Sequence, residues 1–395
     1  MAFLLYGDGI HDDTAAIQEM IDNSCEVILP APKAFYLISK TLILHSNMRL
    51  ILPRFAEIRL ADGSNCLMLK SATVDDRAER ITSRLFCHVN MYSPDFKTEN
   101  ISVEGGIWNY NNKGQNPNPL SCGKYEPYGY SGFIFLFYGV KNLKISSLTF
   151  KDPANFAVTM DRVSYFQVND ITFDYNDGNL YQSNMDGIHL CGNCNNGHIS
   201  NLFGTCYDDI VALNAEEGSG GPIHDVTVNG IYTENSYSAV RLLGATPECS
   251  LKNIHISDIH GTFYHFVIAL MQNYPTETHG VFENIVIDNV FASKSDRALV
   301  KFPLVFKYRR YGVIDIDGKI EVKNLRVSNV YREEYIDNIP TVLITEKSVC
   351  HNVVLENIVN VNKTDKGDMP VYEAKTDKIF KLNTKLLFAD GKEIN

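Results

Sequence analysis

Three aspartates stand at the beginnings of two successive apolar segments. Asp186 precedes the segment of residues 187–190, and Asp208 and Asp209 precede residues 210–213. When the two segments are aligned by their apolar residues, Asp186 and Asp209 occupy the same position and Asp208 comes one residue earlier. In stacked strands, Asp186 and Asp209 would lie roughly 5 Å apart at the backbone. Two such carboxylates would titrate as a coupled pair, or share a bound water or cation.

This arrangement suits the hydrolysis of a glycosidic bond with inversion. Such an enzyme needs a carboxylate that activates water and a carboxylic acid about 6.5–9.5 Å from it. We expect Asp186 and Asp209 to hold the water, and Asp208, offset at the turn, to lie farther away as the general acid. Two alternatives stay open for the three aspartates. They could make only local turn hydrogen bonds, as Asp often does, or they could bind calcium.

A column of basic residues accompanies the aspartates. His189, Arg241 and Lys301 share one register in their apolar segments, with Ala212 and Ala269 between them. Because their neighbours along the chain are apolar, strand alternation predicts that all three point outward on one face. We therefore predict that these three residues bind substrate.

Aromatic side chains near this face are candidates for stacking on sugar rings. Tyr207 and Tyr237 are the two that we expect to bind substrate. Weaker candidates are Trp108, Tyr264 and Tyr274.

The segments that carry these residues belong to a repeat. A polar residue, often Asn, is followed by alternating apolar residues, and from Asn142 onward the copies are 23 to 40 residues apart. The clear copies begin at Asn100, Asn142, Asn253, Asn284, Asn324 and Asn352. Weaker copies start near Tyr165, Gly197 and Asp225. A second apolar segment lies between successive copies, so each repeat holds at least two short strands.

This periodicity predicts an all-β solenoid. Repeats of 20–50 residues are typical of solenoids and propellers, but a propeller blade needs four strands, more than most of these repeats can hold. Long helical patterns are absent between the strands. We therefore predict a single-stranded right-handed parallel β-helix, in which Asn residues at equivalent turns can form hydrogen-bonded ladders.

We expect one domain over residues 1–395. Residues 1–24 are predicted to form an N-terminal strand and a capping helix, residues 25–362 the β-helix, and residues 363–395 a C-terminal cap or tail, because the repeat is lost there. The capping helix begins after an N-cap at Asp12 or Asp13 and carries an apolar face. The residues of this face are Ile17, Met20 and Ile21.

Composition and charge exclude several classes of protein. Hydrophobic residues make up 45% and charged residues 21% of the 395, which supports a sizeable core and excludes wholesale disorder. The net charge of −11 without basic tracts argues against nucleic acid or anionic membrane partners. No apolar run approaches the ~18–20 residues that cross a bilayer.

The N-terminus and the cysteines bear on location. The first residues have no basic region and no cleavage site, which favours the cytoplasm unless a leader has been removed. Nine cysteines, most of them in apolar stretches, favour buried free thiols. The pair Cys191 and Cys194 is a weak zinc motif because a second pair is missing.

Several motifs resemble those of a known family. Residues 6–18 are similar to the opening of pectin-degrading β-helix proteins. The phrase Ser183-Asn-Met-Asp-Gly-Ile188 resembles the Asn-x-Asp-Gly motif of glycoside hydrolase family 28, the polygalacturonases. Residues 208–213 resemble that family's Asp-Asp-Cys-x-Ala-Ile motif, and residues 240–243 resemble its Arg-Ile-Lys motif. The resemblance spans most of residues 6–360.

The resemblance implies inverting glycan hydrolysis, with Asp186 and Asp209 activating water and Asp208 as general acid. Two departures place the chain in a divergent branch. The family's Gly-His-Gly motif has no counterpart, since the coil that should carry it appears deleted between Ala215 and Pro222. The lysine of Arg-Ile-Lys is Leu243 here, which argues against homogalacturonan because that lysine helps to bind the substrate's carboxylate in the family.

Two other functions remain as alternatives. The first is a calcium-dependent polysaccharide lyase, with Arg241 or His189 as the base. The second is a β-helix that binds carbohydrate without cleaving it, as in a phage or surface adhesin domain. Calcium is expected only for the lyase, and a hydrolase would need no cofactor. Each alternative has a carbohydrate partner, and oligomeric state is left open.

Overall fold

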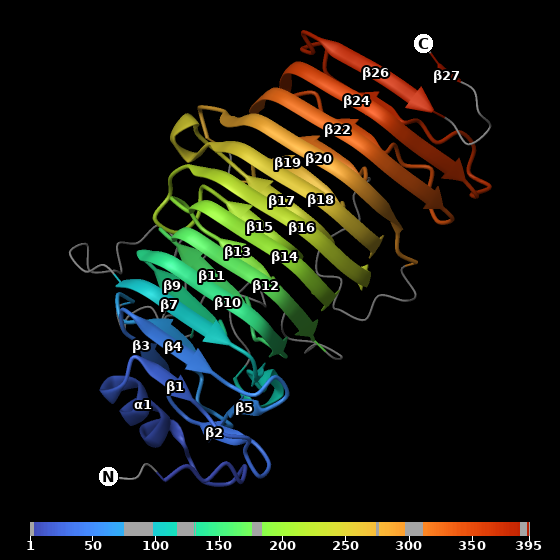
Figure 1. Ribbon diagram of the computed structural model, residues 1–395. Coiled ribbons are helices and arrows are strands. Elements are labelled where there is room, and N and C mark those ends of the chain that lie inside the picture. Colours follow the sequence, from blue (N-terminus) through green and yellow to red (C-terminus); the bar gives the residue numbers. More distant parts are fainter. Residues whose placement is uncertain are drawn as a thin grey trace.

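The protein forms one solenoid that rises from the N-terminal helix to the C-terminal strands (Figure 1). In the computed structural model, residues 4–74, 98–116, 130, 132–175, 184–273, 276–296, 311–387 and 393–394 are described. Strands from successive coils pair in parallel to form two sheets, and the architecture is the predicted right-handed parallel β-helix. Within the described ranges, no helix is long and apolar enough to cross a membrane.

The larger sheet, sheet A, holds the longer strands of the coils. Its strands are β1 (Glu26–Ile28), β2 (Tyr36–Ile38), β4 (Met48–Ile51), β5 (Glu57–Leu60), β7 (Thr98–Glu104), β8 (Ile107–Asn109), β10 (Val140–Lys151), β12 (Ser164–Asp174), β14 (Asn195–Thr205), β16 (Ile223–Ser236), β18 (Leu251–Phe263), β20 (Gly280–Lys294), β22 (Ile320–Glu334), β24 (Val349–Asn362), β26 (Leu382–Leu387) and β27 (Glu393–Ile394). All described pairs are parallel except the last, between β26 and β27.

The second sheet, sheet B, has one short strand in each coil. Its strands are β3 (Leu42–Leu44), β6 (Leu69–Ser71), β9 (Phe135–Tyr138), β11 (Val158–Asp161), β13 (Ile188–Leu190), β15 (Asp209–Asn214), β17 (Ser238–Leu243), β19 (Ile268–Met271), β21 (Ile314–Asp317), β23 (Val342–Ile344) and β25 (Tyr372–Ala374). In the described part of the chain, 3-10 turns lie between strands at Asn112–Gly114 and Pro247–Cys249.

The core consists of identical positions stacked from coil to coil. In sheet B, Val211 lies between Ile188 of the preceding coil and Val240 of the following one. All three side chains are fully buried. Side chains that alternate with them point away from the core. This register brings equivalent positions of successive coils side by side, which is what places residues distant in sequence into one site.

Asparagines at the bends of sheet A form the predicted ladder. The Asn253, Asn284 and Asn324 backbones have φ values of 55°, 57° and 58°, a left-handed region that Asn tolerates better than most residues. The Asn284 amide donates to Asn253 Oδ1 at 2.9 Å, and the Asn324 amide donates to Asn284 Oδ1 at 3.0 Å. Each amide therefore holds the next coil in register.

The N-terminal end is covered by helix α1 (Thr14–Asn23), as predicted. Ile17 and Ile21 are buried against the first coil. The predicted strand before the helix is wrong for residues 4–6, which form no strand. Asp13, the N-cap residue, explains this, because its carboxylate accepts the Tyr6 amide at 2.7 Å and so occupies a donor that a strand would need.

The C-terminal boundary predicted at residue 362 is also wrong. Strand β25 pairs with β23, and β26 pairs with β24, so the repeat continues for a further coil. Charged residues of this coil had concealed the pattern, but Met369 and Val371 are buried. Figure 1 shows β26 at the end of the stack opposite α1.

Candidate active site

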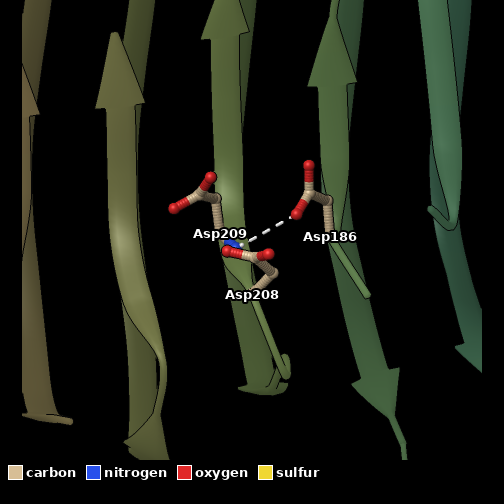
Figure 2. Close-up of side chains that lie close together, drawn as sticks. All are labelled: Asp186, Asp208 and Asp209. Atoms are coloured by element: carbon tan, nitrogen blue, oxygen red, sulfur yellow. Dashed lines mark hydrogen bonds between the residues drawn. The ribbon is translucent and has the colours of Figure 1, made fainter. Parts of the chain in front are cut away.

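The three aspartates lie together at the beginnings of β13 and β15 (Figure 2). The Gly187 amide donates to the Asp209 carbonyl at 2.9 Å, which continues the pairing of the two strands and stacks Asp186 on Asp209. The Asp209 amide donates to Asp186 Oδ1 at 3.2 Å. Each of the three carboxylates is buried. One oxygen of each lies within 4.8 Å of the others.

The expectation that Asp208 stands apart is therefore wrong. The chain bends at residues 207–208, immediately before β15 begins, so the alternation of a regular strand does not apply there. The Asp208 carboxylate joins the cluster instead of projecting away from it.

Asp186 is held by a buried histidine. His189 Nδ1 lies 2.7 Å from Asp186 Oδ2, and His189 Nε2 lies 2.8 Å from Glu217 Oε2. Burial alone would lower the pKa of His189, but its hydrogen bonds to these two carboxylates outweigh burial and raise the pKa to about 10. His189 is thus an imidazolium near neutral pH. Both of its ring nitrogens are engaged by the protein, contrary to the expectation that it binds substrate.

Asp209 is paired with a second cation. Its Oδ2 lies 2.6 Å from Arg241 Nε, and the Ser238 hydroxyl donates to its Oδ1. Burial raises the pKa of Asp209, Arg241 opposes that effect, and the resulting pKa is about 7. The Arg241 side chain keeps 18% of its surface exposed, so it can reach both Asp209 and solvent.

Asp208 is the carboxyl group of the three that forms no ion pair with any described residue. Its Oδ1 is buried and has no hydrogen-bond partner among the described residues. Burial, together with the charges of Asp209 and Asp186, raises the pKa of Asp208 well above its usual range. A proton on Asp208 is therefore favoured near neutral pH, the state that a general acid requires.

The predicted basic column differs from the observed one. His189, Ala212, Arg241 and Ala269 share one register as predicted, but the next coil places Asp315 beside Ala269. Lys301 itself lies outside the described residues. The position that we assigned to a lysine is thus occupied by a buried carboxylate.

The aromatic candidates have different surroundings. Tyr207 and Tyr237 are buried near the carboxylates, and one face of Tyr237 stacks on His265 at 4.5 Å. Tyr264 is also buried, and Tyr274 lies outside the described residues. Trp108 cannot stack on a sugar because it is fully buried in the core.

Two site residues were not found from the sequence. Ser238 occupies the position of Asp209 in the next coil, so the alignment of the repeat could have indicated that the two side chains are neighbours. Glu217 comes from the Gly-rich segment where a coil appeared deleted, and no pattern there indicated that it returns to His189. His224, the nearest histidine to that gap, pairs instead with Asp225 at the surface, at 2.7 Å.

The three carboxylates lie close enough together to hold a metal ion, and calcium is the ion that the sequence left open. Calcium binds six to eight oxygens, whereas Asp186 and Asp209 each already face a protein cation. Of the cysteines that the structure describes, all are free thiols. Cys191 and Cys194 are not part of any described group with metal-ligating geometry.

Part of the chain matches a family model. Residues 95–220 match Glycosyl hydrolases family 28, and this segment contains Asp186, Asp208 and Asp209. No curated protein matches the chain. The protein is thus a divergent parallel β-helix protein that resembles this family.

Solved structures share the fold at low identity. The family 28 exopolygalacturonase of Yersinia enterocolitica is 16% identical, with a TM-score of 0.56 over 99% of this chain and 78% of that one. A polygalacturonase from Erwinia carotovora ssp. carotovora is 13% identical, with a TM-score of 0.61 over 94% of both chains. A tailspike protein mutant of E. coli bacteriophage HK620, in complex with a pentasaccharide, is 14% identical, with a TM-score of 0.65 over 96% of this chain and 63% of that one.

Proposed function

We propose that the protein is a glycoside hydrolase that cleaves a poly- or oligosaccharide. We propose inversion from the family resemblance and not from the spacing, because one oxygen of each carboxylate lies within 4.8 Å of the others, closer than the ~6.5–9.5 Å that separates the two groups in most inverting enzymes. The observation that carries the proposal is the contrast among the three clustered carboxylates. Asp186 and Asp209 each face a cation at hydrogen-bonding distance, whereas Asp208 faces none among the residues that the structure describes, and its pKa is raised. The site thus holds one candidate acid, Asp208, beside two candidate bases, Asp186 and Asp209.

In the proposed reaction, Asp186 and Asp209 hold a water molecule and accept its proton. The water oxygen attacks the anomeric carbon as the bond to the leaving oxygen breaks. Asp208 donates its proton to that leaving oxygen, so that charge does not build up on it. The family match over residues 95–220 supports this class of reaction.

We propose a glycan related to pectin, rather than standard homogalacturonan, as the substrate. Leu243 stands where the family has a lysine, and it packs in an apolar cluster with Phe266 and Met271. Arg241, the remaining cation of that motif, is paired with Asp209. Both observations weaken recognition of a uronate carboxylate.

We propose no metal for this reaction, because His189 and Arg241 supply the positive charge at the carboxylates. A lyase would instead need a base at C5 of an acidic sugar and charge stabilisation for a carbanion. Binding without cleavage is the other alternative. It is consistent with the fold shared with a tailspike protein in complex with a pentasaccharide.

The test is a screen of the full chain on plant and microbial glycans, with products identified by mass spectrometry and NMR. A hydrolase gives saturated products, and the first product carries the anomer opposite to that of the cleaved bond. Unsaturated, ultraviolet-absorbing products, or activity lost on adding a chelator, would identify a lyase. A glycan that binds the wild type and yields no product would identify a binding module.

A further inference from the structure

The segment of residues 216–221 lies against the site without belonging to either sheet. It stands where the family resemblance indicated a missing coil. Ser219 anchors this segment to the preceding coil. Its backbone amide donates to Asp161 Oδ2 at 2.7 Å, and its hydroxyl donates to Asp161 Oδ1 at 2.5 Å. The Asn193 side chain donates to the Gly220 carbonyl at 2.8 Å. Gly218 adopts φ +66°, where a side chain would collide with Asp161.

This anchoring presents one carboxylate to the histidine of the site. Glu217 Oε2 lies 2.8 Å from His189 Nε2 and also accepts a hydrogen bond from the Asn214 side-chain amide at 3.1 Å. Phe156 stacks on His189 with ring centroids 4.1 Å apart and planes 7° from parallel. The ring can therefore not rotate freely, and its two N–H groups stay in line with Glu217 and Asp186.

We infer that Glu217 is a positioning residue that acts through His189 on Asp186, the carboxylate proposed to activate water. The inference rests on the proposed glycosidase function. Glu217 keeps a proton on His189 Nε2, so that the ring is positively charged while its Nδ1–H is donated to Asp186 Oδ2. The Asp209 amide fixes the other oxygen, Oδ1. Asp186 is thereby held in one orientation, and the shared water meets a fixed acceptor.

The charges around His189 agree with this role. Asp186 and Glu217 touch the ring. Asp161, Asp208 and Asp209 also face it, closely enough for its positive charge to oppose the rise of their pKa values on burial. Burial would raise the pKa of Glu217, but its hydrogen bond with His189 dominates and lowers the pKa to about 2. Glu217 therefore stays ionised over the whole working range of a glycosidase.

The test compares Glu217→Gln with Glu217→Asp, and uses Glu216→Gln as the matched control in the same segment. On a glycan that the screen identifies, we expect Glu217→Gln to lower kcat about 10–100-fold, by analogy with the loss of a partner that orients a metal-binding histidine. KM should change less than about twofold, because Glu217 acts on the base and not on the substrate. Glu217→Asp should recover part of kcat, and Glu216→Gln should leave it unchanged.

A second readout needs no substrate. In full-length protein with 15N-labelled histidine, the two ring nitrogens of His189 should both carry protons at pH 8, and one should lose its proton in Glu217→Gln. The His189 signals are assigned with His189→Gln. If Glu217→Gln does not fold, Glu217→Ala is measured by the same spectra, and a His189 that stays doubly protonated in that folded variant overturns the inference.

The two readouts separate the inference from the proposed function. A His189 that stays doubly protonated in Glu217→Gln, or a kcat within twofold of wild type, overturns the positioning role. If the wild type cleaves no glycan, the proposed function fails, and the nitrogen spectra still decide whether Glu217 sets the protonation of His189.

Discussion

The two sheets of the β-helix use the coil repeat in opposite ways. In sheet A, the same residue type recurs at the bends, and Asn253, Asn284 and Asn324 bond to one another along the axis. At the strand starts of sheet B, the residue changes from coil to coil, and Asp209 lies beside Ser238 in the next coil. Repetition of one residue stabilises the stack, whereas changes of residue within an unchanged register assemble a site.

The ladder itself is interrupted at the coils that carry the site. Asn142 is bonded to Asn100 in the preceding coil at 2.8 Å, and Asn253 to Asp225 at 2.8 Å. Between them, Tyr165 takes the bend position, and the Asn196 amide donates to its own neighbour, Asn195. This ladder is thus broken around Asp186, where a second row still joins the coils: the Asn201 side-chain amide donates to Asn169 Oδ1 at 2.9 Å.

The largest effect on the site should come from Asp208→Asn. We expect kcat to fall about 10²–10⁴-fold, because the amide keeps the shape of the acid but cannot protonate the leaving oxygen. Ligand binding and thermal stability should change little, since burial beside Asp209 and Asp186 already favours the uncharged form of the side chain that is replaced. Steady-state kinetics and binding by calorimetry check both statements. More than about a tenth of wild-type activity would remove Asp208 from that role.

The next largest effect, on stability, should come from Arg241→Gln. This variant leaves Asp209 buried with Ser238 as its partner, and breaking such a pair costs about 3–5 kcal/mol while the carboxylate is ionised. Asp209 can escape this cost by taking up a proton. Its pKa is about 7 in the folded protein, above the 3.8 of an ordinary Asp, and losing Arg241 raises it further.

The sign of the pH dependence follows. A carboxyl group with a raised pKa binds more protons in the folded state, so its contribution to stability is lost as pH rises from about 4 through 7. The deficit of Arg241→Gln relative to wild type should therefore be small at pH 5 and grow toward pH 9, as measured by urea unfolding. Arg241→Lys keeps the charge and should show a smaller pH dependence. A deficit that is the same at both pH values would contradict the pairing.

The comparison of the two sheets also explains what the sequence could predict. Register is a property of the whole repeat, so the stacking of Asp186 on Asp209 followed from aligning the apolar segments. Glu217 could not be found in this way, because its segment leaves the repeat and its position depends on Asp161 and Ser219. Lys301 was misplaced for a related reason, since an alignment by apolar pattern cannot choose between it and Asp315 when the coil length changes.

In sheet A, Asn284→Ala should lower stability without affecting catalysis. The change removes the ladder bonds to Asn253 and Asn324, which contribute about 0.5–1.5 kcal/mol each. It also places alanine at φ +57°, at a cost of about 1–2 kcal/mol. We expect a loss of about 2–5 kcal/mol by urea unfolding and an unchanged kcat. Asn284→Gly also removes the ladder bonds, but glycine adopts the positive φ without strain. Its loss of stability should therefore be smaller than that of Asn284→Ala, and equal losses would contradict the backbone contribution.

The smallest effect should come from the aromatic ladder on the outside of sheet A. Phe203, Tyr232, His260 and Phe291 stack across four coils at centroid distances of 5.0–5.3 Å and within 13° of parallel. Their faces cover one another, so the rings offer mainly edges to solvent and no flat platform for a sugar. We therefore assign the ladder to stability, where each contact contributes about 0.5–1.5 kcal/mol beyond burial.

His260→Thr interrupts the ladder at its centre and removes two well-stacked contacts. We expect a loss of about 1 kcal/mol by urea unfolding, because threonine preserves strand propensity and the position is partly exposed. Tyr331→Thr is the matched control. Tyr331 ends the same column, its ring is tilted by 38° at 6.3 Å from Phe291, and its loss should be the smaller of the two. Neither variant should change kcat, since both lie on sheet A and the carboxylates lie on sheet B. A reduced kcat with normal stability would mean that sheet A contributes to the reaction. It would contradict the assignment of stability to sheet A and of the reaction to sheet B.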